Sequence, residues 1–425
     1  MPLRWRQVLR ELEPLATSVG AYAFATLFGL LWGSFANVCI YRWPEGKSVV
    51  APGSHCFACQ TPIRWYDNVP LLSWLWLRGK CRTCEAPFSA RYLIVEALTG
   101  LLFGLAWWFT VSVGAYFEPF DQRLIRFAVY ATFCFVLVVI TFIDIDHKMI
   151  FDKVTLPSIV IFYGLSFLLP EHHWYDGLIG VAVGYGLPWT IGEVYWLLTG
   201  REGLGLGDAK LLALIGALLG IRGVVASLFG GALLGSVIGI AGLLRGHGGG
   251  SRRGAWFAVA AVVSVGVATF GVVTNRIAVG AIGCVLSLAA LVLSRRMEPV
   301  TEEPVTFEEP APAEVRDAAL SGKDLAARVL ALVAGVLVLS GVMFTLLDWR
   351  EGGLGAGLLG IGLLLLAKRL IPHPEPSGDA EPSSQEDAPS LMHTELPFGP
   401  YLALAATVYL FAEPWILVNF RLPGG

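Results

Sequence analysis

Four of the seven cysteines stand in two C-x-x-C pairs, CFAC and CRTC, with 21 residues between the pairs. The first pair is Cys56 with Cys59, and the second is Cys81 with Cys84. Two such hooks can place four thiolates around one tetrahedral zinc ion, although this gap slightly exceeds the usual range. Paired or free thiols are the alternative. His55 could replace one ligand, but a surface histidine is its simpler interpretation.

Carboxylates are the second group that could do chemistry. The apolar run FVLVVITFIDIDHKMIFDKVTLP carries Asp144, Asp146 and Asp152 at its end, and GLGLGDAKLLALIGALLG places Asp208 at the start of another apolar stretch. Ionisable groups at the mouths of membrane spans are costly, so each is a functional candidate. The alternative is that Asp144 and Asp146 mark a solvated helix end.

Two carboxylates that share a partly desolvated site cannot both ionise easily, so one serves as a base and the other as an acid. A water between them could attack a peptide carbonyl, which is the arrangement of aspartic proteases. Gly203, Gly205 and Gly207 precede Asp208 and would let a substrate strand approach closely. A phosphate-binding loop is a weak alternative, because no G-x-x-x-x-G-K-[ST] pattern follows.

The composition predicts an all-α, polytopic membrane protein that must position these groups. Of the 425 residues, 55% are hydrophobic and 15% are charged, and the mean hydropathy is +0.66. Against about 20 residues per helical span, about twelve stretches are candidates. They are 17–39, 96–116, 125–145, 154–170, 177–199, 210–221, 223–244, 255–274, 277–294, 325–347, 353–371 and 398–418.

Lysine and arginine in short loops predict the orientation in the membrane. The polar segment after the first stretch carries seven such residues, among them Arg64, Arg82 and Arg91, so this side is expected to face the cytoplasm. The loops expected outside are poorer in base, and FEPFDQRLIR has two; Arg4, Arg6 and Arg10 run against this assignment. The N-terminus lacks a cleavage site, so the first stretch is expected to remain as an anchor. No basic block suggests nucleic acid.

A series of motifs in order resembles the type IV prepilin peptidase family, which are membrane aspartic proteases. The motifs are GSFANVCIYRWP, the two hooks around TPIRWYDNVPLLSWLWLRGKC, RYLIVEALTG, IDIDHKMIFDKVTLP, GREGLGLGDAKLLALIGALLG and LPFGPYLALAA. The resemblance implies that Asp144 and Asp208 are the catalytic pair. It also implies cleavage of prepilins or type II secretion pseudopilins after a glycine, at the cytoplasmic face of the inner membrane. Members with the cysteine-bearing domain usually then methylate the new N-terminus with S-adenosylmethionine.

The expected organisation follows from this resemblance as an eight-helix peptidase core with about four inserted helices. The segments are 1–40, with the first helix; 41–95, a small cytoplasmic zinc-binding domain; 96–245, the peptidase core; 246–395, the inserted helices with acidic linkers; and 396–425, the last core helix and tail. Phe151 stands where the family commonly has proline. Glu193 and Glu413 are unexplained acids, expected to contact either a basic group or substrate.

Two other classes of protein remain as alternatives. A transporter or channel would use intramembrane acids for ions, but it should carry them near the middle of the bilayer. A membrane scaffold would use the zinc domain only for docking and would need no acid pair. The candidates here gather at one membrane face, which favours the peptidase.

Overall fold

A computed structural model describes residues 11–113, 118–199, 205–245, 350–370 and 397–419, with short pieces between 330 and 342. The chain divides into two compact units. The first contains Met1–Ala182, Lys210–Ser227 and Pro397–Trp415, and the second contains Val183–Ala209, Leu228–Leu396 and Ile416–Gly425. In the described residues the regular structure is helical, apart from two isolated β-bridges.

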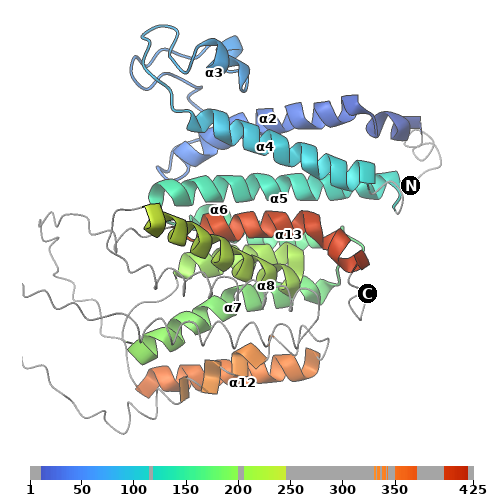
Figure 1. Cartoon of the computed structure of the whole chain (residues 1–425), viewed down its shortest axis with the longest axis vertical. Coiled ribbons are helices and arrows are strands. Elements are labelled where there is room, and N and C mark those ends of the chain that lie inside the picture. Colours follow the sequence, from blue (N-terminus) through green and yellow to red (C-terminus); the bar gives the residue numbers. More distant parts are fainter. Residues whose placement is uncertain are drawn as a thin grey trace, which may run out of the picture. The chain divides into compact units, whose positions relative to one another are not determined.

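The helices follow one another along the chain with few long connections (Figure 1). The elements of the first 170 residues are α2 (Val19–Arg42), the short turn η1 (Trp65–Asp67), α3 (Leu72–Trp76), α4 (Arg91–Trp107) with its π-helical extension η2 (Trp108–Ser112), α5 (Phe120–His147) and α6 (Asp152–Ser166). Then come α7 (Trp174–Thr199), α8 (Leu206–Arg245), α12 (Arg350–Leu370) and α13 (Gly399–Asn419).

Glycines let α2 and α4 pack with almost no space between their backbones (Figure 1). A Cβ built on Gly29 would lie 2.5 Å from Phe103 Cβ, and one on Gly33 would lie 2.7 Å from Glu96 Cα. On the facing helix, Gly100 is similarly closed off by Leu30. Small residues four apart allow such close contact between helices in lipid. This pair forms a rigid base for the polar segment that connects α2 to α4.

One face of α5 is buried along most of its length. Phe133, Leu137, Ile140 and Asp144 are at most 5% exposed, and their spacing of four, three and four places them on one helical stripe. Apolar residues fill the stripe until its last turn, where Asp144 takes the next position. The sequence prediction of an apolar helix that ends in acids is confirmed here, and the helix begins five residues earlier than expected.

The two bases of FEPFDQRLIR lie in α5 and are neutralised by acids. Arg123 is fully buried, donates to the Val111 carbonyl at 2.7 Å and pairs with Glu13. Arg126 pairs with Glu118 and Glu171. Since each base has an acidic partner, neither adds an uncompensated positive charge at this end of α5.

Among the residues that the structure describes, four helices are long and apolar enough to cross a membrane, which indicates a membrane protein: Val19–Arg42, Arg91–Ser112, Phe120–His147 and Leu206–Ile238. The stretches 154–170, 177–199, 353–371 and 398–418 correspond to α6, α7, α12 and α13. Those at 255–274 and 277–294 lie outside the described residues, as does most of 325–347. Eight core helices and the five sequence segments therefore stay predictions.

The expected stretches 210–221 and 223–244 both lie in α8, which is interrupted at Gly220. Gly220 has φ 63° and ψ −167°, a conformation that residues with a side chain rarely adopt. Before this break, α8 crosses α7 at Gly216. A Cβ built there would lie 2.1 Å from the Gly180 carbonyl oxygen, so only glycine fits on either side.

The turn before α6 forms without proline. Phe151 caps the helix with φ −81° and ψ 112°, and its carbonyl accepts from the backbone N–H groups of Val154 and Thr155. This φ is close to the value that proline fixes. The substitution therefore leaves the turn in the extended conformation that a proline would also take.

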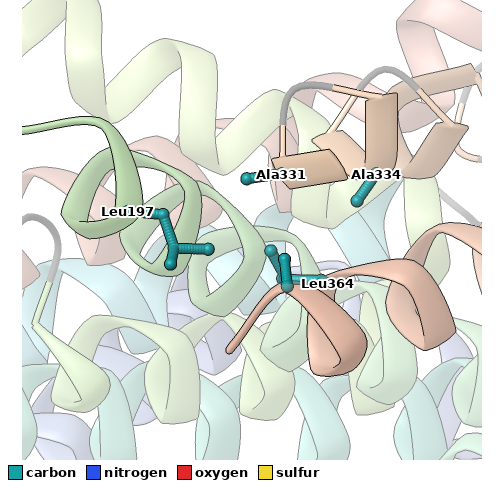
Figure 2. Close-up of a cluster of buried hydrophobic side chains, with 5 residues drawn as sticks. Leu197, Ala331, Ala334 and Leu364 are labelled. Carbon is teal, nitrogen blue, oxygen red and sulfur yellow. The ribbon is translucent and has the colours of Figure 1, made fainter. Parts of the chain in front are cut away.

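In the second unit, α12 packs against the end of α7. Leu197, Ala331, Ala334, Leu364 and Ala367 form a buried cluster, and Figure 2 shows the side chains of Leu197 and Leu364 extending into the space between their two helices. Glu193 accepts from Lys368 Nζ at 2.7 Å. The expectation that Glu193 meets a basic group is confirmed. In the first unit, the other unexplained acid, Glu413, accepts from the Tyr409 hydroxyl at 3.1 Å.

Candidate functional site

The four paired cysteines come together in the polar segment between α2 and α4. Cys56, Cys59, Cys81 and Cys84 have ligand atoms within 4.8 Å of one another. The Sγ atoms of Cys56 and Cys84 are 3.7 Å apart, and those of Cys59 and Cys81 are 3.9 Å apart. Zinc–sulfur bonds of about 2.3 Å in a tetrahedron require sulfur–sulfur edges of about 3.8 Å. The cluster therefore has the dimensions of a four-thiolate metal site.

The two hooks are structural copies of each other, a feature that the sequence analysis missed. In the first, Cys56 N–H donates to the Thr61 carbonyl and a bridge joins His55 to Pro62. In the second, Cys81 N–H donates to the Ala86 carbonyl and a bridge joins Lys80 to Pro87. The residue after the second cysteine of each hook, Gln60 or Glu85, has a positive φ of 56° or 55°. Aligning HCFACQTP with KCRTCEAP would have exposed this repeat.

The local contacts favour the thiolate form that a metal needs at two of the four cysteines. At Cys84 a backbone hydrogen bond with Ala86 acts in the same direction, but desolvation and the three neighbouring thiols outweigh it and raise the pKa to about 12. Hydrogen bonding to Thr61 lowers the pKa of the Cys59 thiol to about 6, and backbone hydrogen bonds lower the pKa of Cys81. His55 lies outside the cluster, where its Nδ1 is 3.1 Å from the Gly53 carbonyl. Its alternative role as a ligand is not supported.

An ion pair ties the second hook to the connecting loop. Arg82, inside CRTC, donates from Nε to Asp67 Oδ2 at 2.8 Å, and its Nη2 pairs with the same carboxylate. This bidentate contact lowers the pKa of Asp67. Two stretches that are distant in sequence are thus joined beside the thiols.

Asp144 ends the buried stripe of α5 and meets the start of α13. Its side chain is buried, and Oδ2 has no hydrogen-bond partner among the described residues. A Cβ built on Gly399 would lie 2.5 Å from Asp144 Oδ2 and 3.2 Å from Cγ. A larger residue at position 399 would therefore displace this carboxylate. Sequence analysis missed Gly399 as a site residue, although LPFGPYLALAA was among the motifs.

The neighbouring acids of α5 and α6 are engaged in ion pairs. Asp146 pairs with Arg91 at the start of α4, and Arg91 also donates to the Phe142 carbonyl at 3.2 Å. Asp152 accepts from Lys210 Nζ at 2.7 Å. Among the three acids of this run, Asp144 is thus the one whose carboxylate is buried at the end of the apolar stripe.

Asp208 lies in the first turn of α8, where its backbone N–H donates to the Gly205 carbonyl at 3.1 Å. Gly205 is exposed and Gly207 is half-buried. A Cβ on Gly205 would lie 3.7 Å from Asp208 Oδ2, which is ordinary contact distance. Asp208 belongs to the second unit and Asp144 to the first. The convergence of the two carboxylates stays a prediction.

Two known families match the parts of the chain that contain the candidate sites. A family described as "Bacterial Peptidase A24 N-terminal domain" matches residues 27–110, and the "Type IV leader peptidase family" matches residues 131–240. The thiol cluster lies in the first match, and both Asp144 and Asp208 lie in the second. No solved structure matches the chain.

Relatives with assigned names cover about half of this chain. The prepilin leader peptidase/N-methyltransferase of Aeromonas hydrophila is 39% identical over 225 residues, which make up 47% of this chain and 73% of that protein. The protein of the same name from Neisseria gonorrhoeae is 38% identical over 239 residues, or 49% and 78%. That from Myxococcus xanthus is 38% identical over 205 residues, or 48% and 58%.

Helices able to cross a membrane and a sequence match to peptidases define the class as membrane-bound peptidases. The chain belongs to the type IV leader (prepilin) peptidase family and is an enzyme of that family.

Proposed function

We propose that this enzyme removes the short basic leader of type IV prepilins or type II secretion pseudopilins, using Asp144 and Asp208 as its catalytic pair. The observation that carries the proposal is the placement of Asp144. It occupies an apolar position of α5, is 5% exposed, and faces Gly399. A buried carboxylate is costly to the folded state, so its presence at this position favours a functional role.

The chemistry would follow from two carboxylates that differ in protonation. The ionised carboxylate takes a proton from a water molecule as the water oxygen attacks the carbonyl carbon of the leader's last glycine. The protonated member stabilises the carbonyl oxygen, and the peptide C–N bond then breaks as its nitrogen gains a proton. Gly205 and Gly207 would let the extended substrate backbone come close to Asp208. No covalent enzyme intermediate is required.

The cysteine cluster would hold a structural zinc ion. Four thiolates without an open position for water are typical of structural zinc sites. The ion would stabilise the segment between α2 and α4, and Cys56, Cys59, Cys81 and Cys84 would be its ligands. This segment has two bridges and one five-residue helix as its regular structure, apart from η1.

The same chain would then methylate the new N-terminus of the pilin, as the names of the relatives suggest. S-adenosylmethionine, when bound, supplies a methyl group whose bond to sulfur breaks as a bond to the amine nitrogen forms. The protein's part is to bind the donor and to present the deprotonated amine. We place both reactions at the cytoplasmic face of the inner membrane, with prepilins, pseudopilins and lipid as partners and without nucleic acid.

Mass analysis of a prepilin-like substrate's N-terminus tests both steps together. Membranes that contain wild-type enzyme should yield a substrate that has lost its leader up to the glycine and gained one methyl group. Asp144→Ala and Asp208→Ala should each leave the leader in place, whereas Asp121→Ala, in the first turn of α5, should cleave normally. Equal cleavage by all variants would overturn the aspartic mechanism. Cleavage by wild type without methylation would mean that the enzyme is a peptidase without methyltransferase activity.

A further inference from the structure

Helix α3 carries apolar side chains on the face that the rest of the first unit leaves uncovered. Leu72, Leu75 and Trp76 are 65%, 57% and 82% exposed, and their spacing of three and one places them on one side of the helix. Ser73 and Trp74, on other sides, are half-buried. A helix on a water-exposed domain would turn its apolar face inward, so the arrangement here is the reverse of that pattern.

The polar segment folds back along α2 and α4 before it reaches α3. Leu71, directly before α3, donates its backbone N–H to Glu96 Oε2 at 2.8 Å. Glu96 in turn packs on α2, where a Cβ built on Gly33 would lie 2.7 Å from Glu96 Cα. Gly33 precedes Arg42, the last residue of α2, by about two and a half helical turns, or about 13 Å along the axis. The start of α3 therefore lies alongside the last turns of α2 and not beyond its end.

Contacts on the opposite side fix the orientation of α3. Trp74 points away from the exposed face, and a Cβ built on Gly79 would lie 2.9 Å from its Cζ2 atom. Gly79 has a φ of 68°, which glycine adopts without strain. Leu71 has a φ of 58°, which is rare for a residue with a side chain. The turns before and after α3 thus hold its apolar face outward, within the first unit.

We propose that α3 is an interfacial anchor, which inserts Leu72, Leu75 and Trp76 among the lipids around the adjoining ends of α2 and α4. Both of these helices are long and apolar enough to cross a membrane, and α3 lies near the ends that the segment joins (Figure 1). The face is therefore continuous with a surface that lipid already covers. The proposal goes beyond the two reactions proposed above and depends on neither.

The chemistry of the face suits a bilayer boundary. Tryptophan is enriched at this level, because its ring is apolar and its N–H group is polar. Arg78 and Lys80 follow α3 directly, and both are exposed. Basic residues beside an inserted apolar face are attracted to the phosphate groups of anionic lipids. Apolar insertion and contact with headgroups can thus occur together at one short helix.

Protein partners fit this face less well. A stable protein interface needs roughly 800 Å² on each side, and three side chains of a five-residue helix offer less than that. The membrane helix of a substrate is apolar along its whole length, whereas two bases stand directly beside this face. Lipid requires neither a large area nor a continuous apolar surface.

Collisions of a nitroxide at position 76 with oxygen and with a water-soluble nickel complex test the placement without relying on turnover. Trp76→p-acetylphenylalanine keeps an aromatic ring and takes a nitroxide at its ketone, so the cysteines stay unlabelled. The full-length protein is placed, one chain per disc and without substrate, in nanodiscs of phosphatidylethanolamine and phosphatidylglycerol. The label should meet oxygen more often than nickel and lie about 5–10 Å below the lipid phosphates, as interfacial helices do.

The control is the same label at position 50. Val50 is 87% exposed and lies in the loop that Arg42 holds through the carbonyls of Ser48 and Gly53. This loop follows the end of α2, so its label should collide freely with the nickel complex. Nickel collisions as frequent at position 76 as at position 50 would overturn the anchor.

A second variant links the depth of the label to the apolar face. Leu72→Gln combined with Leu75→Gln should move the label at position 76 toward water, with loss of most of its excess of oxygen collisions. Limited proteolysis of residues 50–90 that matches wild type shows that the segment keeps its fold. A label shielded from both reagents would mean that another part of this chain covers α3, and shielding that appears only when prepilin is added would make the substrate the occupant. Either result overturns lipid as the partner.

Discussion

The thiol cluster and the acidic end of α5 lie in the same unit but have opposite effects on the stability of the fold. The four thiols come from two adjacent copies of one hook, and all of their partners lie within a short segment. Asp144 instead ends a buried apolar stripe, and its carboxylate occupies the space that a side chain at the distant Gly399 would take. The first arrangement uses its polar groups to stabilise local structure. The second keeps a buried carboxylate without a bonded Oδ2, at a cost in stability.

The largest effect that would test this contrast is loss of the metal. Cys56→Ser combined with Cys84→Ser should reduce zinc from about one ion per chain to almost none and expose residues 50–90 to protease. Apparent zinc binding contributes about 10–16 kcal/mol in small zinc domains. Zinc analysis of the purified protein and limited proteolysis measure both effects. Cys39→Ala, in a membrane helix, should leave the metal in place; full zinc in the double variant would contradict the assignment.

Removing the charge of Asp144 at the end of α5 should stabilise the fold, whereas loss of the metal should destabilise it. Asp144→Asn should raise the thermal unfolding midpoint in detergent, because a neutral amide is less costly to bury than a carboxylate. Cleavage should fall by about 10²–10⁴, the usual contribution of general acid–base catalysis. A variant that loses both stability and cleavage would show that Asp144 is a structural residue.

Gly399→Ala should show how far cleavage depends on the position of the Asp144 carboxylate, because this variant keeps the carboxylate itself. The added Cβ would press on the Asp144 carboxylate, so cleavage should fall about tenfold or more, equivalent to about 1.4 kcal/mol of transition-state stabilisation. Gly362→Ala is the control, because a Cβ there meets nothing within 4 Å. The two variants are compared by the rate of leader removal, and equal rates would mean that Gly399 does not position Asp144.

The smallest effect is expected at Asp146. Its ion pair with Arg91 is partly exposed, and such pairs contribute at most about 1 kcal/mol. Asp146→Asn should therefore change the unfolding midpoint by a few degrees and cleavage by less than about threefold. A loss as large as that of Asp144→Asn would mean that the second aspartate of IDID, and not the first, does the chemistry.

The sequence predicted those features that depend on local pattern. The length of the apolar stretch predicted the helix that ends in Asp144, and the cysteine spacing predicted the thiol cluster. The spacing alone did not exclude His55, because choosing among ligands requires the turn geometry that the hydrogen bonds of each hook provide. Gly399 could not be singled out, since its importance depends on a contact between α13 and α5. The junction of α8 was placed near residue 222, whereas the break lies at Gly220, where φ is positive.

The contact between α12 and α7 bears on the added portion of this chain, which lies outside both family matches. Leu364 packs in one cluster with Leu197 of α7 (Figure 2), and Lys368 pairs with Glu193 of the same helix. The next described helix, α8, carries Asp208 in its first turn. A helix outside both family matches therefore contributes to the stability of the end of α7, the helix that precedes Asp208 in the chain.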